Sequence, residues 1–119
     1  MMGTDDDLAL ALRHHQAGRL DAAAALYQAL IATRPADGAP PFMLGLIQLA
    51  RGWYPEAVAL LTRAAALSPL HGRVHSALGD ALVRARQFPV AVEAYRRAIG
   101  LDGNDVGAWH GLARTLSTL

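Results

Sequence analysis

The sequence predicts an all-α protein, a stack of about seven antiparallel helices, and two observations lead to this fold class. Alanine supplies 25 and leucine 19 of the 119 residues, and both are strong helix formers. Self-comparison of the chain also finds a period of 34 residues, long enough for a pair of helices. Because 53% of the residues are apolar and 18% are charged, the composition excludes disorder. The scarcity of β-branched and aromatic residues excludes an all-β fold.

The 34-residue period aligns turn residues as well as the abundant alanines and leucines, which a compositional bias alone would not do. Between residues 38–71 and 72–105, nine positions are identical. Glycines and prolines recur at matching places in successive units: Gly18 and Gly52, Pro55 and Pro89, Pro35 and Pro69. We therefore predict a single domain over residues 1–119, with repeats at 4–37, 38–71 and 72–105 and a lone first helix of a fourth repeat at 106–119.

Each unit is expected to contain two helices, and the second unit shows the signals best. Its first helix is predicted from about Pro41 to Arg51 and is closed by Gly52. Pro55 suits the first turn of the next helix, and Pro69 follows the end of that helix.

The other units repeat this arrangement with small variations. In the first unit, the acids of residues 5–7 suit a helix N-terminus, and Asp21 is a candidate N-cap. In the third unit, Pro89 stands at the matching helix start, and Gly103 replaces the closing proline.

One position of each first helix holds a small residue, which lets the paired helices approach closely: Ala11, Gly45, Gly79 and Ala113. Larger residues on the second helices are expected to fill the space opposite: Tyr27, Leu61 and Tyr95. In the last helix, Trp109 is expected to pack into the third unit.

These residues resemble the signature of the tetratricopeptide repeat family. Trp109-His110-Gly111-Leu112-Ala113 is similar to the opening of that signature, and Leu44-Gly45 and Leu78-Gly79 match its Leu-Gly pair. Its alanine at the start of the second helix and its closing proline also have counterparts: Ala23, Ala57 and Ala91, then Pro35 and Pro69. The resemblance covers nearly the whole chain and implies a right-handed superhelix whose concave surface, lined by the first helices, holds ligands. The chain departs from the pattern at Asp7 and His14, where the family has bulky residues.

The absence of cysteine and lysine excludes several chemistries, among them disulfides, thiolate nucleophiles, Cys-ligated zinc and Schiff bases. The adjacent His14 and His15 diverge on a helix, and no carboxylate accompanies His71 and His75 at metal-ligand spacing. We therefore expect no metal site and no cofactor.

Catalytic arrangements are equally hard to find. His75, Ser76 and Asp80 lie close in sequence, but sequence neighbours on a helix do not face each other as the members of a triad do. The two glutamates, Glu56 and Glu93, are 37 residues apart, and no glycine-rich phosphate loop occurs. The chain is therefore predicted not to be an enzyme.

Charge and hydropathy limit the partners and the location. The formal net charge of +1 does not favour nucleic acid or an anionic membrane. The acids of residues 5–7 are unlike a secretory leader, and the longest uncharged stretch, residues 38–50, is too short to span a bilayer. A soluble, cytoplasmic protein of bacterial type is expected, with a protein or peptide as its partner.

The predicted ligand site follows from the resemblance, which places the first helix of each unit along the concave groove. The groove is expected to be apolar at one end and lined by arginine at the other. The candidate peptide-binding residues are Phe42, Met43, Leu46, Leu49, Arg73, Ser76, Asp80, Arg84, His110 and Arg114. Asp80 is expected to pair with Arg84 or Arg114 and to leave at least one guanidinium free for an acidic residue of the peptide. An alternative interpretation is that Phe42, Met43 and Leu46 only pack against neighbouring helices.

Two known uses of the family are disfavoured by residue type. The positions of the Lys/Asn/Arg clamp that holds chaperone tails carry Leu8, Leu12, Met43, Arg73 and Ala77, so only Arg73 survives. An asparagine ladder, as in GlcNAc transferases, is absent because the single asparagine, Asn104, falls in a loop.

The leading hypothesis is a protein–protein interaction scaffold that binds a peptide or partner protein in the concave groove. Two alternatives stay open. One is the N-terminal accessory region of a larger bacterial enzyme, such as a glycosyltransferase or sulfotransferase. The other is a self-assembly module, because the final helix has apolar residues and no following partner helix: Trp109, Leu112 and Leu116.

Overall fold

A computed structural model describes the backbone of residues 4–119 and the side chains from Asp6 onward. Residues 1–3 of the predicted domain and the side chain of Asp5 lie outside this description. The described chain forms seven α-helices and no strand. The helices are α1 (Thr4–Gln16), α2 (Leu20–Thr33), α3 (Ala39–Arg51), α4 (Tyr54–Leu67), α5 (Gly72–Arg84), α6 (Phe88–Leu101) and α7 (Val106–Thr118). The predicted all-α class is confirmed.

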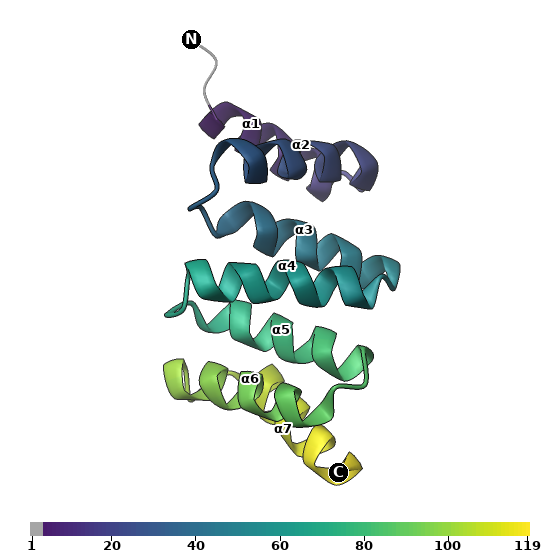
Figure 1. Ribbon diagram of the computed structural model, residues 1–119, viewed down its shortest axis with the longest axis vertical. Helices are drawn as coiled ribbons and strands as arrows, with labels where there is room; N and C mark the ends of the chain where they lie inside the picture. The colour runs from purple at the N-terminus through teal and green to yellow at the C-terminus, as the bar shows by residue number, and fades with distance from the viewer. Residues whose placement is uncertain (1–3) are drawn as a thin grey trace.

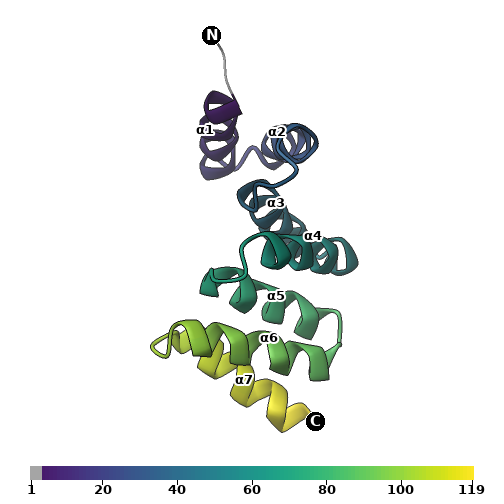
Figure 2. The ribbon, with the colours of Figure 1, turned by 60° about the vertical axis from the view of Figure 1, so that its left-hand side comes forward.

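Consecutive helices pack against one another and form an elongated stack of 51 × 26 × 22 Å (Figures 1 and 2). The tightest packing joins α1 with α2, α3 with α4, and α5 with α6, which are the predicted pairs. One pair cannot bury its own apolar surface, so each pair depends on the neighbours above and below it.

The predicted turn residues end and start the helices. Gly52 ends α3 in the left-handed conformation with φ 80°, which favours glycine because a Cβ is disfavoured there. Pro55 and Pro89 lie in the first turns of α4 and α6. The predicted N-cap role of Asp21 is wrong. Helix α2 begins at Leu20, so Asp21 lies inside its first turn and pairs with Arg51 of the next repeat.

The close approach within the second and third pairs depends on a glycine opposite a large side chain. A Cβ added at Gly45 would lie 2.7 Å from Cγ of Leu61, and one added at Gly79 would lie 2.7 Å from the Tyr95 ring. Real Cβ atoms do not come so close, so a side chain at either position would force the opposite residue to move. Ala113, at the equivalent position of α7, is exposed because no second helix follows it in the described chain.

We expect Gly79→Ala to lower the free energy of unfolding by about 1–3 kcal/mol, since the new methyl must displace the Tyr95 ring in a packed core. The matched control is Gly100→Ala in α6, where an added Cβ meets nothing within 4 Å. That variant should be neutral or more stable by up to about 1 kcal/mol, because alanine is the better helix former. Urea unfolding followed by circular dichroism measures both. Equal stability of the two variants would contradict the close packing at Gly79.

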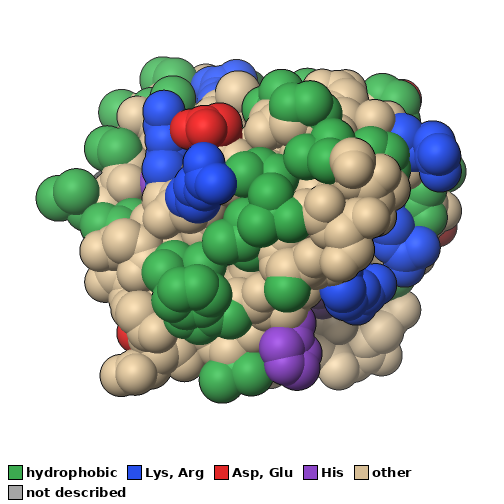
Figure 3. Space-filling view, turned by 90° about the horizontal axis from the view of Figure 1, so that it is seen from below, with side chains coloured by type: hydrophobic (Ala, Val, Ile, Leu, Met, Phe, Trp, Pro, Cys, Tyr) green, Lys and Arg blue, Asp and Glu red, His purple; other side chains and the backbone are tan. Residues whose placement is uncertain are grey.

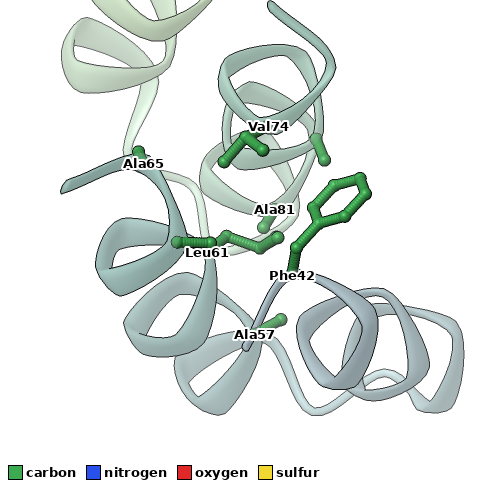
Figure 4. Packing of buried hydrophobic residues seen from close by; sticks show 8 residues of the cluster. Phe42, Ala57, Leu61, Ala65, Val74 and Ala81 are labelled. Atoms are coloured by element: carbon green, nitrogen blue, oxygen red, sulfur yellow. The ribbon is translucent and has the colours of Figure 1, made fainter. Parts of the chain in front are cut away.

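The central core lies between the second and third repeats. Phe42 of α3, Leu61 of α4, and Val74 and Ala81 of α5 point toward one another there (Figure 4). Ala57 and Leu61 are fully buried, and Phe42 is 8% exposed. The core therefore joins repeats rather than filling one repeat.

The predicted packing of Trp109 into the third unit holds only at the edge of that unit. Its side chain is 50% exposed, and its indole N–H donates to the carbonyl oxygen of Gly103 at 2.8 Å. Instead, the residues of α7 that pack against the third unit are Ala108, Leu112 and Thr115. In the preceding repeats the position of Trp109 is buried, at Pro41 and His75, where a second helix covers it. In the described chain α7 has no such cover.

Candidate functional site

A hollow of about 760 Å³ lies along α5 and α7, with Leu49 of α3 at its edge; we call it the α5–α7 groove. Six of the ten predicted site residues line it: Leu49, Ser76, Asp80, Arg84, His110 and Arg114. They come together because the 34-residue period places residues of successive first helices at equivalent places, as Asp80 and Arg114 show.

The other four predicted residues lie outside this groove. Phe42 belongs to the central core, and Met43 and Leu46 are half-buried against that core. The Arg73 guanidinium lies 6.0 Å from the centre of the Phe42 ring, at the far end of α5. The predicted apolar end of the site is therefore largely occupied by packing between helices, as the alternative interpretation of Phe42, Met43 and Leu46 expected, and only Leu49 reaches the groove.

The floor of the groove is formed by Tyr95 of α6, which passes between α5 and α7. Its ring packs against Gly79 on one side and Gly111 on the other, where an added Cβ would lie 2.7 Å from the Tyr95 hydroxyl. The hydroxyl donates a hydrogen bond of 2.6 Å to Oδ1 of Asp80. This contact fixes the Asp80 carboxylate at the centre of the groove and leaves Oδ2 available as an acceptor.

The predicted pairing of Asp80 with an arginine is wrong, because its described polar partner is Tyr95. Arg84 lies over the Tyr54 ring instead, with its guanidinium carbon 5.8 Å from the ring centre. No described ion pair involves Arg84 or Arg114. Both guanidinium groups are therefore available to a ligand.

Burial shifts the titration of the two groups on the floor. Loss of water around the carboxyl raises the pKa of Asp80, and Asp105 adds to this, while the Tyr95 hydrogen bond and the positive charges of Arg114 and Arg84 act in the opposite direction. Burial and the neighbouring Asp80 raise the pKa of Tyr95 far above its ordinary value, so its hydroxyl remains a donor at neutral pH.

Sequence reasoning missed several residues of the groove. Tyr95 was identified only as a residue of α6 that fills the space opposite Gly79, although Asp80, next to Gly79 on α5, was already a candidate for the site. Phe88, at the start of α6, was not identified as a site residue because it lies on a second helix. The remaining additions are Thr115 and Thr118. The groove thus offers two guanidinium groups that form no described ion pair, one carboxylate held by Tyr95, and apolar side chains.

His75 and His14 have hydrogen-bond partners within the fold. His75 is 4% exposed, and its Nε2 donates to the carbonyl oxygen of Pro69 at 2.7 Å. The Arg19 guanidinium donates to Nδ1 of His14 at 2.9 Å. In the part of the chain that the structure describes, no three histidine, aspartate or glutamate side chains are grouped as metal ligands. No helix of residues 4–119 has the length and apolar character needed to cross a bilayer.

Fold and site together define a class of protein, a helical-repeat scaffold with a ligand-sized groove on the side of its first helices. The tetratricopeptide repeat family model matches residues 8–72, 42–106 and 76–116. The chain belongs to the tetratricopeptide repeat family, as its sequence signature predicted. No curated protein matches the sequence.

Solved structures share the fold over almost the whole chain. MamA MSR-1 is 26% identical, with a TM-score of 0.85 over 98% of this chain and 67% of its own. The first TPR of Spaghetti (RPAP3), solved with the HSP90 peptide SRMEEVD, is 17% identical, with a TM-score of 0.92 over 97% of this chain and 91% of its own. The Arabidopsis OM64 TPR domain is 14% identical, with a TM-score of 0.91 over 98% and 96%. The family and these neighbours support a protein–protein interaction scaffold.

Proposed function

We propose that the chain binds a peptide segment of a partner protein in the α5–α7 groove. The observation that carries this proposal is the grouping of Arg84, Arg114 and the fixed Asp80 carboxylate around one hollow beside apolar Leu49 and Phe88.

The chemistry of the groove favours a peptide with one or two bulky apolar residues followed by an acidic residue. The planar guanidinium groups suit a carboxylate, with which arginine forms paired hydrogen bonds. Oδ2 of Asp80 suits a backbone N–H of the peptide. The binding of SRMEEVD by the first TPR of Spaghetti is a precedent for an acidic peptide on this fold. Because most clamp positions here are apolar, we expect a different peptide from a chaperone tail.

The test is selection of peptides from a phage library on the immobilised chain, followed by titration of the selected peptides. A small groove of this kind should bind with micromolar affinity, about −7 to −8 kcal/mol. We expect Arg84→Ala with Arg114→Ala to weaken binding by at least about tenfold and to flatten its salt dependence.

The matched control removes the same charge elsewhere. Arg63→Ala with Arg96→Ala changes two exposed arginines that do not line the groove, and it should leave the affinity within about twofold. Selected peptides that bind both double variants equally well would place the ligand outside the α5–α7 groove and overturn the proposal.

Self-association through α7 is a second candidate function, and a separate observation favours it. Val106, Trp109 and Leu116 are 64%, 50% and 46% exposed on this helix. Viewed from the α7 end, hydrophobic side chains gather across the end of the stack (Figure 3). Such a patch is typical of an interface.

Sedimentation velocity over a range of concentrations tests this second candidate. We expect the chain to form a dimer or larger assembly, and Leu116→Glu to shift it toward the monomer by at least about tenfold in dissociation constant, because a charge would then be buried in the interface. Ser117→Glu, one exposed residue further on, is the control. A wild-type chain that stays monomeric at millimolar concentration would exclude an α7 interface.

A further inference from the structure

A second hollow, of about 790 Å³, lies between α4 and α6, with α5 as its floor; we call it the α4–α6 groove. The face of α5 that lines the α4–α6 groove differs from the face that lines the α5–α7 groove. His75, Leu78 and Leu82 face the α4–α6 groove, whereas Ser76 and Asp80 face the other. At about 100° per residue, these two sets lie on roughly opposite sides of the helix. The proposed peptide site therefore does not include this surface.

We propose that the α4–α6 groove binds an amphipathic α-helix of a partner protein, independently of the α5–α7 groove. Its walls include the short side chains of Ala65 of α4 and Ala94 of α6, and its floor is formed by Leu78 and Leu82 together with His75, which is already hydrogen-bonded to Pro69. Along α6 it extends from Val90 to Leu101, or about 16 Å at 1.5 Å per residue, which is the length of three helical turns.

Comparison with the preceding repeat shows what opens this groove. At the equivalent places between α2 and α4 stand Ile31 and Leu60, 34 residues before Ala65 and Ala94, and both larger side chains pack against the core. The floor residue there, Leu44, is 2% exposed, whereas its equivalent Leu78 is only half-buried. Two alanines in place of large aliphatic residues thus leave an apolar space that the same fold fills one repeat earlier.

The polar groups around the groove favour a helix over an extended peptide. Both walls are α-helices, whose interior backbone N–H and C=O groups already bond to each other. An extended chain lying on the apolar floor would leave its own backbone groups without partners. A helix satisfies its backbone internally and presents only side chains, which the alanine walls can accept.

The charges on the rim define the partner further. Glu93 and Arg97 line the groove on α6, one turn apart, and both are exposed. Within residues 4–119 neither forms a described ion pair, although the i, i+4 spacing favours one. A complementary helix would have an apolar stripe at i, i+4 and i+7, a basic residue facing Glu93 and an acidic residue facing Arg97.

The test is a subtractive selection from a phage library of helical peptides of about 15 residues. The library is first depleted on the Ala94→Leu chain, whose groove is filled with the residue of the preceding repeat, and then selected on the wild-type chain. We expect enrichment of peptides with the apolar stripe and an acidic residue one turn along. Ala94→Leu should weaken the selected peptides by at least about tenfold, and Arg97→Glu by about threefold or more.

Controls separate this site from the peptide site and from a folding defect. Ala59→Leu, an exposed position of α4 outside both grooves, and the Arg84→Ala, Arg114→Ala double variant should leave the affinity unchanged. Circular dichroism checks that Ala94→Leu folds; Ala65→Ile fills the same space and replaces it if it does not.

Three outcomes would overturn the proposal. The first is a selection in which no peptide is enriched over the filled variant. The second is a set of peptides sensitive to the Arg84 and Arg114 changes, which would assign them to the α5–α7 groove and leave the proposed function intact. The third is that no helical peptide is selected, while dodecanoate binds to the wild-type chain and not to Ala94→Leu. That result would assign the α4–α6 groove to an acyl chain.

Discussion

Arginine at position 57 is expected to unfold the chain. Ala57 is fully buried in α4, within the cluster that joins the second and third repeats (Figure 4). A guanidinium there has neither space nor a hydrogen-bond acceptor. Burying an unpaired charge in a packed core should lower the free energy of unfolding by about 4 kcal/mol or more, which is more than most single mutations cost. Because domains of this size are stable by only about 5–15 kcal/mol, this cost removes most of the stability at the lower end of that range and should greatly lower the melting temperature. Ala91→Arg, at the equivalent place one repeat later and also fully buried, should behave in the same way.

Thermal melting followed by circular dichroism measures this effect. The matched control is Ala59→Arg, two residues further along α4 at an exposed position, which should melt within a few degrees of the wild type. Melting of Ala57→Arg as high as the control would mean that α4 is rotated from the orientation described above.

The second large effect is expected for Phe42→Ala, and it should be an effect on stability. The Phe42 ring fills the space between α3 and α5, with the His71 ring 6.1 Å away and the Arg73 guanidinium beside it. Removing a buried phenylalanine leaves a cavity in a core that cannot fully collapse, which costs about 3–5 kcal/mol. Urea unfolding should therefore show a large decrease in the midpoint, while binding of the selected peptides at low temperature should hold within about twofold.

Phe88→Ala is the matched control, because Phe88 is half-buried and lines the α5–α7 groove. It should cost about 1 kcal/mol in stability and weaken the peptides by at least about tenfold. Loss of peptide binding by folded Phe42→Ala, together with unchanged binding by Phe88→Ala, would restore the assignment of Phe42 to the ligand site.

The fold was predictable because the determinants of a helical repeat are local and periodic. Gly52 and Pro55 mark the turn between α3 and α4. Glycine readily adopts the left-handed conformation and proline lacks a backbone N–H, and both are properties of the residues themselves. The recurrence of a small residue opposite a large one, Gly79 opposite Tyr95, predicts the close approach within a pair without knowledge of the rest. The role of Asp21 was less predictable, because the exact first residue of a helix depends on the turn before it.

Six residues of the site were predicted from the register of the repeats together with the family resemblance, which implies that the first helices line the groove. The 34-residue register is a geometric relation, so Asp80 and Arg114 had to lie at equivalent places on neighbouring helices, facing one hollow. Residue type then identified the charges that such a hollow would present.

The tertiary structure alone decided how these side chains are used. Phe42 lies in the core rather than in the groove because it packs in one buried cluster with Val74 and Ala77 of α5, and packing between repeats depends on all the side chains between the helices. Asp80 meets Tyr95 rather than an arginine because Gly79 and Gly111 let the Tyr95 ring pass between two helices, a contact that no periodicity within one helix encodes. The α4–α6 groove exists because Ala65 and Ala94, 29 residues apart, are small at the same place in space. Sequence by itself determined which residues form helices and which helices pair, because those depend on neighbours along the chain. The side chains that line each groove depend on which residues lie close together in the folded structure.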